Sequence, residues 1–306
     1  MVSRCKKGKA NMSSQVIRAM TRDGSARVVV CNTSEIVREA QRLHALSPTA
    51  EIALGQLLTA ASMMGSLMGE KQEKLTLGIQ GDGPLGNLLV TADYYGNVRG
   101  YVQNPEVDLP QRADGAPDLA GAIGDGLLYV IHDTGAPEKQ TGTVRFSGGE
   151  IPQHITLYYA ESEQIPSACS LGVQRTKDGD APVAGGVLIQ LLPGASEEVI
   201  AELEGNIPLI SNVSQLLGSG CTCEDLMARA LANIPYDLID AIDVDYLCSC
   251  SREGMRQNVF SLGRQEIEKV FREQAEEGHD TIECVCHFCN STYEFTLNEF
   301  IEKLDN

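Results

Sequence analysis

Two closely spaced pairs of cysteines near the C-terminus constrain this chain more than any other feature. One residue separates Cys248 from Cys250, two separate Cys286 from Cys289, and 35 residues lie between the pairs. Such pairs supply the four thiolates of a tetrahedral Zn²⁺ site, two from each arm. Because the stretch 246–306 is below the size at which a hydrophobic core usually suffices alone, we expect one Zn²⁺ per chain to hold it together in the reduced protein.

Export and a disulfide scaffold are not expected. The chain has 10 cysteines in 306 residues, and its first 14 residues contain no apolar stretch typical of a signal peptide. A run of about 18 apolar residues is also absent, so the sequence predicts no membrane span. In an unexported protein, close cysteine pairs indicate metal or redox sites. We therefore expect a soluble, cytoplasmic protein.

Metal binding and disulfide formation exclude each other at such a site. Zinc–sulfur bonds near 2.3 Å place neighbouring sulfurs roughly 3.8 Å apart, whereas a disulfide needs about 2.05 Å. If each pair oxidises internally, the cross-link between the two arms is lost, and the small loops that replace it constrain the unfolded chain far less. Structural zinc contributes roughly 10–16 kcal/mol, so oxidation is predicted to unfold residues 246–306.

Three further cysteines near the two pairs, Cys284, Cys221 and Cys223, could also take part in metal binding or pack in the fold. Cys284 forms a second C-x-C pattern with Cys286, and in a strand both point to the same side. We exclude Cys284 from the ligand set, because four ligands fill tetrahedral zinc and the two-residue spacing of Cys286 and Cys289 suits a tight turn. Cys221 and Cys223 lie at a predicted helix start, where they either pack or face solvent.

The charge is distributed unevenly. The net charge is −18, and residues 196–245 hold 10 acidic groups against 1 basic group, which is half of the total. We divide the chain into a basic leader (1–12), expected to be disordered, a core domain (13–195), an acidic helical linker (196–245) and the zinc module (246–306). The acidic balance argues against nucleic acid and anionic membranes as partners.

The fold class is predicted as α+β, with a largely antiparallel sheet in the core domain. Asp23-Gly24 indicates a hairpin. The predicted strands are Val16–Met20, Arg27–Cys31, Lys74–Gln80, Asn87–Ala92, Val98–Gln103, Ser170–Lys177 and Val187–Leu192. One predicted helix is capped by Thr33 or Ser34, a longer one opens at Ser47-Pro48 and runs through Met68, and a third covers Ile151–Gln164.

The linker is predicted to be helical, and the zinc module to contain helices and a hairpin. The linker helices are Ser196–Leu203, Ile207–Leu217 and Glu224–Ala232, and the last begins with a capping-box pattern of Thr222 and Asp225. Repeated glycines and prolines indicate that the linker has little core of its own. In the module we expect a helix at Gln265–Glu277, a hairpin at Thr281–Phe295 and a closing helix at Leu297–Leu304.

The sequence contains no pattern that indicates an enzyme or a nucleotide site. Gly81–Gly86 matches GxGxxG, but a predicted strand follows it instead of the helix that would hold a pyrophosphate, so a hairpin turn is expected. The five histidines are scattered and fit no catalytic motif. Met63, Met64 and Met68 are expected to pack in the core, with a methionine-rich binding surface as the alternative.

With CSC and CHFC in a C-terminal module, the chain resembles the bacterial redox-regulated heat-shock chaperone of 33 kDa, a holdase family. The similarity covers nearly the whole chain from Ser13, although the interval between the cysteine pairs is slightly longer than usual in the family. The segments that carry it are Gly83–Ala92, Gly96–Val102, Ser162–Pro166 and Pro235-Tyr236.

The resemblance implies a mechanism. The reduced zinc form is inactive, and oxidation forms disulfides Cys248–Cys250 and Cys286–Cys289, expels zinc and unfolds the module and the linker. The activated protein then forms a homodimer and holds unfolding clients without ATP, with residues 13–195 as the candidate client-binding and dimerisation domain. The alternatives are a thiol-disulfide oxidoreductase that uses CHFC and a zinc-ribbon nucleic-acid-binding protein.

Overall fold

The computed structural model describes residues 13–113, 116–148, 150–175, 181–276 and 279–300. The chain divides into a first unit that ends at Leu247 and a second unit that begins at Cys248, and each is described by itself. The basic leader predicted at 1–12 lies outside the described residues. Within the described part of the chain, no helix combines the length and apolarity that a membrane crossing requires.

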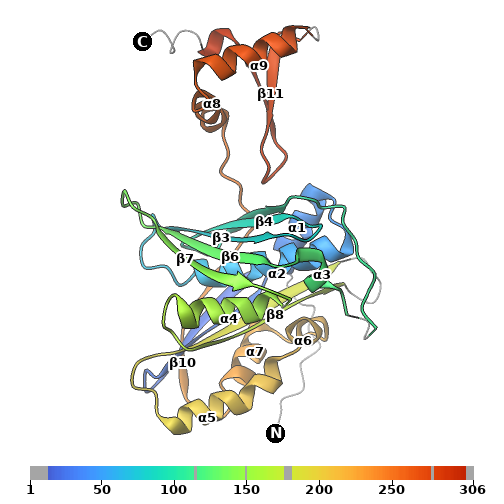
Figure 1. The fold of residues 1–306 in the computed structure, drawn as a ribbon. Coiled ribbons are helices and arrows are strands. Elements are labelled where there is room, and N and C mark those ends of the chain that lie inside the picture. The colour runs from blue at the N-terminus through green and yellow to red at the C-terminus, as the bar shows by residue number, and fades with distance from the viewer. Residues whose placement is uncertain (1–12, 114–115, 149, 176–180, 277–278, 301–306) are drawn as a thin grey trace. The chain divides into compact units, whose positions relative to one another are not determined.

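Two five-stranded antiparallel sheets form the framework of the first unit (Figure 1). The first sheet has the strand order β10-β1-β2-β9-β8. Its strands are β1 (Gln15–Thr21), β2 (Ala26–Asn32), β8 (Ser167–Arg175), β9 (Pro182–Leu191) and β10 (Tyr236–Asp243). The hairpin predicted at Asp23-Gly24 joins β1 and β2, and Gly24 has a φ of 74°, a backbone conformation that favours glycine.

The second sheet has the strand order β5-β4-β3-β6-β7. Its strands are β3 (Lys74–Gly81), β4 (Asn87–Asp93), β5 (Val98–Val102), β6 (Gly126–Asp133) and β7 (Gln140–Phe146). The predicted meander is confirmed, and the glycine motif at 81–86 is the turn between β3 and β4 rather than a phosphate-binding loop. β6 and β7 lie outside the predicted strands, and β7, mostly polar with exposed positions, has little of the apolar alternation that indicates a strand.

Helix α2 (Pro48–Gly65) lies between the two sheets (Figure 1). The Ser47 side chain caps it by accepting a hydrogen bond from the Ala50 N–H at 3.1 Å. Nearly all of α2 is buried, as expected for a helix that is covered on both sides. Met63 and Met64 are only 1% and 3% exposed, so they pack in the core and form no surface. The other helices of this part are α1 (Ser34–His44), α3 (Leu119–Ile123) and α4 (Ile151–Glu161).

The helices of residues 196–245, here called the acidic segment, pack on the face of the first sheet opposite α2 (Figure 1). The predicted capping box is formed, since the Asp225 N–H donates to Thr222 Oγ1 at 3.2 Å and the Thr222 N–H to Asp225 Oδ2 at 3.0 Å. Leu226 and Met227 are fully buried against the sheet. The elements before β10 are α5 (Glu197–Asn206), the 3₁₀ helix η1 (Ile207–Ile210), α6 (Val213–Gly218) and α7 (Cys223–Ala230).

The predicted helices of the acidic segment end at Ala232, and the strand that follows them was not predicted. Residues 236–243 form β10, an edge strand that pairs antiparallel with β1. Arg18 of β1 forms a two-bonded ion pair with Asp240, and Arg22 Nε lies 3.0 Å from Asp237 Oδ1. Arg18 of β1 and Arg22, just after the strand, therefore pair with acidic residues of β10 that the linear sequence shows only as part of a charged run.

Alternate residues of β8 hydrogen-bond to the acidic segment. Ser170 Oγ donates to the carbonyl of Ile210 at 2.9 Å, and Gln174 Nε2 donates to the carbonyl of Ser214 at 3.0 Å. Gly172 lies between them on the same face of the strand, because side chains of a strand alternate. The short helices of the segment are thus attached to the sheet by polar bonds as well as by apolar packing.

The second unit is small and has few core residues. Its elements are α8 (Arg252–Phe260), α9 (Arg264–Glu276), β11 (Thr281–Val285) and β12 (Thr292–Thr296). The predicted hairpin and helix are present, α8 was not expected, and part of the predicted helix 297–304 lies outside the described residues. Its core consists of Val259, Ile267, Phe271, Ile282, Phe295 and Phe300. The expected α+β class with antiparallel sheets is confirmed.

Candidate metal centre

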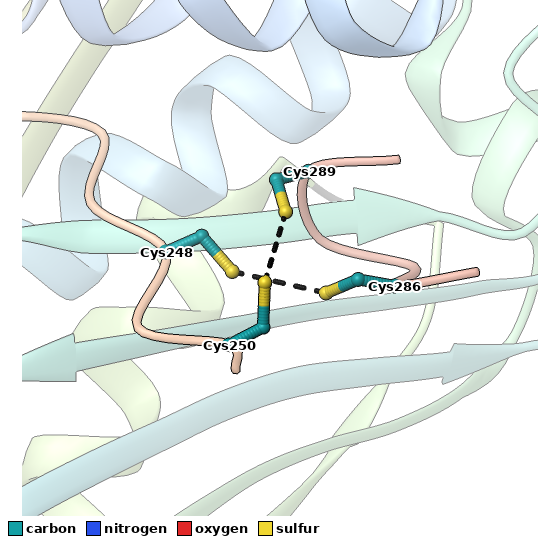
Figure 2. Close-up of side chains that lie close together, drawn as sticks. All are labelled: Cys248, Cys250, Cys286 and Cys289. Atoms are coloured by element: carbon teal, nitrogen blue, oxygen red, sulfur yellow. Dashed lines mark hydrogen bonds between the residues drawn. The ribbon is translucent and has the colours of Figure 1, made fainter. Parts of the chain in front are cut away.

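Four cysteine sulfurs converge in the second unit. Cys248 and Cys250 approach from the segment before α8, and Cys286 and Cys289 from the turn of the β11–β12 hairpin (Figure 2). All four sulfurs lie within 4.8 Å of one another. The distance from Cys248 Sγ to Cys286 Sγ is 3.8 Å, and from Cys250 Sγ to Cys289 Sγ 3.3 Å. Residues almost 40 positions apart in sequence therefore form one cluster of thiols.

Local backbone structure explains how each arm presents its sulfurs. The Cys286 N–H donates to the carbonyl of Ser291 at 2.9 Å, and the Asn290 N–H donates to the carbonyl of Cys286 at 2.8 Å. Asn290 has a φ of 56°, in the left-handed region that asparagine tolerates. In the first arm, Ser251 caps α8 by accepting from the Gly254 N–H at 3.1 Å. A tight turn and a helix start thus fix the two arms.

The donor set fits a thiophilic metal ion. The sulfur separations are close to the roughly 3.8 Å expected around tetrahedral zinc and far from the about 2.05 Å of a disulfide. Four thiolates favour zinc or iron–sulfur chemistry over hard cations such as Mg²⁺. Cys286 is buried and the other three are partly buried, so the centre is shielded but reachable from solvent.

The surroundings of Cys286 and Cys289 shift the pKa values of their thiols in opposite directions. Burial raises the pKa of the Cys286 thiol, although the backbone N–H groups of Phe288 and Cys289 oppose this effect. At Cys289 partial burial also acts to raise the pKa, but hydrogen bonds from the Ser291 hydroxyl and amide outweigh it and lower the pKa to about 7. Cys289 is therefore more readily present as a thiolate, the form that binds metals, than Cys286 is.

Cys284 stays outside the group of four sulfurs. It lies on β11 opposite Tyr293 of β12 and packs at the edge of the core of the second unit. Burial raises the pKa of its thiol, so it is less prone to ionise. The geometry thus brings together the four cysteines named from their spacing, and their role as ligands stays a prediction.

Two further cysteines and two of the histidines considered above are buried or hydrogen-bonded within the first unit. Cys221 and Cys223 are 5% and 4% exposed, so they pack and do not face solvent. His44 Nε2 lies 3.2 Å from the hydroxyl of Tyr246, and His154 Nδ1 lies 3.0 Å from the carbonyl of Glu150. Among the described residues, the four-cysteine cluster is the one group of cysteine, histidine and acidic side chains arranged to hold a metal.

Tyr293 is the contact of this centre that sequence reasoning missed. Its hydroxyl oxygen lies 3.2 Å from Cys250 Sγ, although 42 residues separate the two in sequence. Its position four residues after Cys289, on the strand that leaves the cysteine turn, is the signal that places it near the sulfurs. A tyrosine in a predicted strand is more often a packing residue, so its type alone gave no reason to select it.

Comparisons with known proteins cover nearly the whole chain. The family model described as "Hsp33 protein" matches residues 14–296. The "33 kDa chaperonin" of Acetivibrio thermocellus is 40% identical over 290 residues, which are 95% of this chain and 96% of that protein. The "33 kDa chaperonin" of Caldanaerobacter subterraneus subsp. tengcongensis is 40% identical over 299 residues, which are 96% of this chain and 100% of that protein.

A solved structure shows the same architecture. The crystal structure of the 33 kDa chaperonin, a heat shock protein 33 homolog, from Thermotoga maritima superposes with a TM-score of 0.85 at 32% sequence identity. The superposition covers 96% of this chain and 98% of that chain. With a family model over nearly the whole length and relatives at this identity, the chain belongs to the Hsp33 family, a family of chaperones and not of enzymes.

Proposed function

We propose that this protein is a redox-regulated, ATP-independent holdase of the cytoplasm that binds unfolding proteins under oxidative stress. The observation that carries the proposal is the group of four thiols within 4.8 Å in a unit with a small core. In the reduced state Cys248, Cys250, Cys286 and Cys289 hold one Zn²⁺. When bound, the ion supplies a cross-link between the two arms, which stabilises the fold of the second unit.

Oxidation removes this cross-link. Each sulfur must approach its partner to about 2.05 Å to form a disulfide, a distance at which tetrahedral coordination is lost. The proposed pairs are Cys248 with Cys250 and Cys286 with Cys289. Both lie within one arm, so the new loops are short and no covalent bond joins the arms. The six buried apolar side chains that remain are too few to stabilise a domain of this size without a metal.

The acidic segment is the next part to lose its fold. Its chain passes directly from β10 to Cys248, and Tyr246, just before the first ligand, bonds through its hydroxyl to the N–H and carbonyl of Gly100 at 3.2 and 2.7 Å. The helices of the segment have 4 to 10 residues, too short to be stable alone. Repulsion among 10 acidic groups with 1 basic group opposes their packing further.

Release of the acidic segment uncovers apolar surface that suits unfolding proteins. Under α7 and α6 the first sheet presents a patch of fully or nearly fully buried side chains, among them Val28, Val30, Val187 and Ile189. Unfolding chains expose apolar segments for which such a patch is a partner. We assign client binding and formation of a homodimer to the first unit after oxidation, and neither nucleic acid nor nucleotide takes part.

The structure argues against catalysis of thiol–disulfide exchange. A redox-active C-x-x-C pair is typically activated at the N-terminus of a helix. Cys286 and Cys289 instead lie in a turn between two strands, β11 and β12. A turnover enzyme is therefore not the function that this geometry favours.

The proposal is tested by measuring zinc content and suppression of client aggregation before and after treatment with hydrogen peroxide. We expect one zinc per reduced chain and little suppression, then loss of zinc and strong suppression after peroxide, reversed by a thiol reductant. A reduced protein without zinc, or activity that does not change with peroxide, overturns the proposal.

A further inference from the structure

Tyr293 bridges the two arms of the candidate metal centre. Its backbone belongs to β12, in the second arm, and its hydroxyl oxygen lies 3.2 Å from Cys250 Sγ, in the first arm. Strand pairing with Cys284 and packing of its ring against the core of the second unit fix the position of this hydroxyl. Strand pairing and core packing thus act together with the contact to Cys250 to place this hydroxyl at the sulfur.

The sulfurs of the two arms differ in their hydrogen-bond donors. In the second arm, Cys286 receives the backbone N–H groups of Phe288 and Cys289, and Cys289 is hydrogen-bonded to the amide and hydroxyl of Ser291. These hydrogen-bond partners come from the same turn as the sulfurs. The hydroxyl in contact with Cys250 comes instead from Tyr293, across the centre.

We propose that Tyr293 is a positioning residue for Cys250, whose hydroxyl donates a hydrogen bond to the sulfur, keeps it in the four-thiol group and restrains its reaction with peroxide. The inference rests on the proposed function of the centre. Four thiolates around Zn²⁺ carry a formal charge of −2, and a donor that disperses this charge stabilises the ligated set. The same hydrogen bond reduces the electron density that the sulfur offers to an oxidant.

The restrained reaction is a two-electron oxidation by hydrogen peroxide. The Cys250 thiolate attacks one peroxide oxygen, the O–O bond breaks, and a sulfenic acid and hydroxide are formed. A second thiolate then attacks the Cys250 sulfur, a disulfide bond forms, and a second hydroxide leaves. The two sulfurs lose two electrons, and the peroxide gains them. Loss of the hydrogen bond accelerates the first step, because the hydrogen bond no longer draws electron density from the sulfur lone pair that attacks the peroxide.

The test uses the full-length protein and a variant that removes only the hydroxyl, Tyr293→Phe. The matched control is Tyr95→Phe, which removes a hydroxyl from a 43% exposed side chain of the first unit. Transfer of zinc to a chromogenic chelator gives the affinity, and loss of free thiols gives the rate with peroxide. We expect Tyr293→Phe to bind zinc about 10–100-fold more weakly, the usual effect of removing such a partner, and to oxidise several-fold faster, with no change in the control.

Two further measurements separate the hydrogen bond from a general effect on folding. In the Co²⁺-loaded protein, the sulfur-to-metal charge-transfer band moves to lower energy in Tyr293→Phe, because the sulfur electrons are held less tightly. Site-specific Tyr293→3-fluorotyrosine keeps the ring and strengthens the donor, so the band and the peroxide rate shift in the opposite direction. Equal behaviour of Tyr293→Phe and wild type, or shifts of both variants in the same direction, overturns the inference. Failure of the wild type itself to bind zinc overturns the proposed function instead.

Discussion

Gly172 of β8 and Ser214 of α6 approach so closely that a side chain at position 172 has no room. A Cβ atom placed on Gly172 would lie 2.6 Å from Ser214 N and 2.9 Å from both Ser214 Cβ and Ser214 Oγ. The carbonyl of Ser214 meanwhile accepts the hydrogen bond from Gln174. Ser214 can therefore lie directly against β8 because Gly172 has no side chain, and the hydrogen bond from Gln174 keeps it there.

Gly172→Ala is predicted to loosen the acidic segment in the reduced, zinc-loaded protein. The three nearest atoms to the new methyl all belong to Ser214, so relief of the clash requires α6 to move away from the sheet. Overpacking of this kind costs about 1–3 kcal/mol. We expect faster hydrogen exchange in 196–245 and partial chaperone activity before any peroxide is added, with zinc content unchanged.

Gly205→Ala is the matched control for this prediction. It lies in α5 of the same segment, and its added methyl would meet no atom within 4 Å. Alanine there should leave exchange unchanged or slow it, since alanine is a better helix former than glycine. If Gly172→Ala also keeps wild-type exchange and remains inactive when reduced, the close contact does not control release of the segment.

Substitution of the two neighbouring cysteines is predicted to have opposite outcomes. Cys286 belongs to the group of four sulfurs, whereas Cys284, two residues earlier, packs beside Tyr293. Cys286→Ser should lose zinc and the response to peroxide, and Cys284→Ser should keep one zinc per chain and the response. Metal analysis of both purified variants checks this. Release of zinc by Cys284→Ser would show that the ligand set is wrong by one residue.

The elements with strong local signals were predictable from sequence. The Asp23-Gly24 hairpin, the meander from β3 to β5 and the capping box at Thr222 each have a signal within a few residues. The four cysteines were predictable for the same reason, because metal chemistry constrains their spacing. Short-range sequence patterns do not show which residues pair with others that are distant in the chain.

β10 and Tyr293 illustrate this limit. Residues 236–243 form a strand because they pair with β1, more than 200 residues earlier in the chain, and because Asp240 bonds to Arg18. An isolated reading of 196–245 sees short helices, an acidic run and glycines, which suggests a linker without a partner. The contact of Tyr293 with Cys250 likewise depends on how the hairpin folds back on the first arm. Both features arise from tertiary structure, which overrides local preference.

Removal of the metal under reducing conditions is predicted to unfold the second unit selectively. Its buried core is limited to a few side chains around Phe295 and Phe300, whereas the core around α2 extends over both sheets. After addition of a zinc chelator and a thiol reductant, amide protection in 252–296 should be lost while β3 and β4 remain protected. Added zinc should restore protection. If 252–296 stays protected without metal, the unit folds on its core alone and the structural role assigned to zinc is wrong.

Oxidation at the metal centre is predicted to release the acidic segment although the reacting thiols lie outside it. Peroxide should remove zinc first, and faster hydrogen exchange in α5, α6 and α7 should follow, because these short helices depend on packing against the sheet. The exchange of each peptide, measured against peroxide exposure together with zinc release, gives the order of events.

A variant of Cys223, a thiol within the acidic segment, tests whether peroxide reacts with the segment directly. Cys223 begins α7 and is 4% exposed, and burial raises the pKa of its thiol to about 12, so almost none of it is in the reactive thiolate form near neutral pH. Cys223→Ala should therefore release zinc and the segment at the same peroxide dose as wild type, whereas Cys250→Ser should lack the peroxide-dependent step. If Cys223→Ala abolishes release while zinc still leaves, the segment has a sensor of its own and the metal centre does not control it.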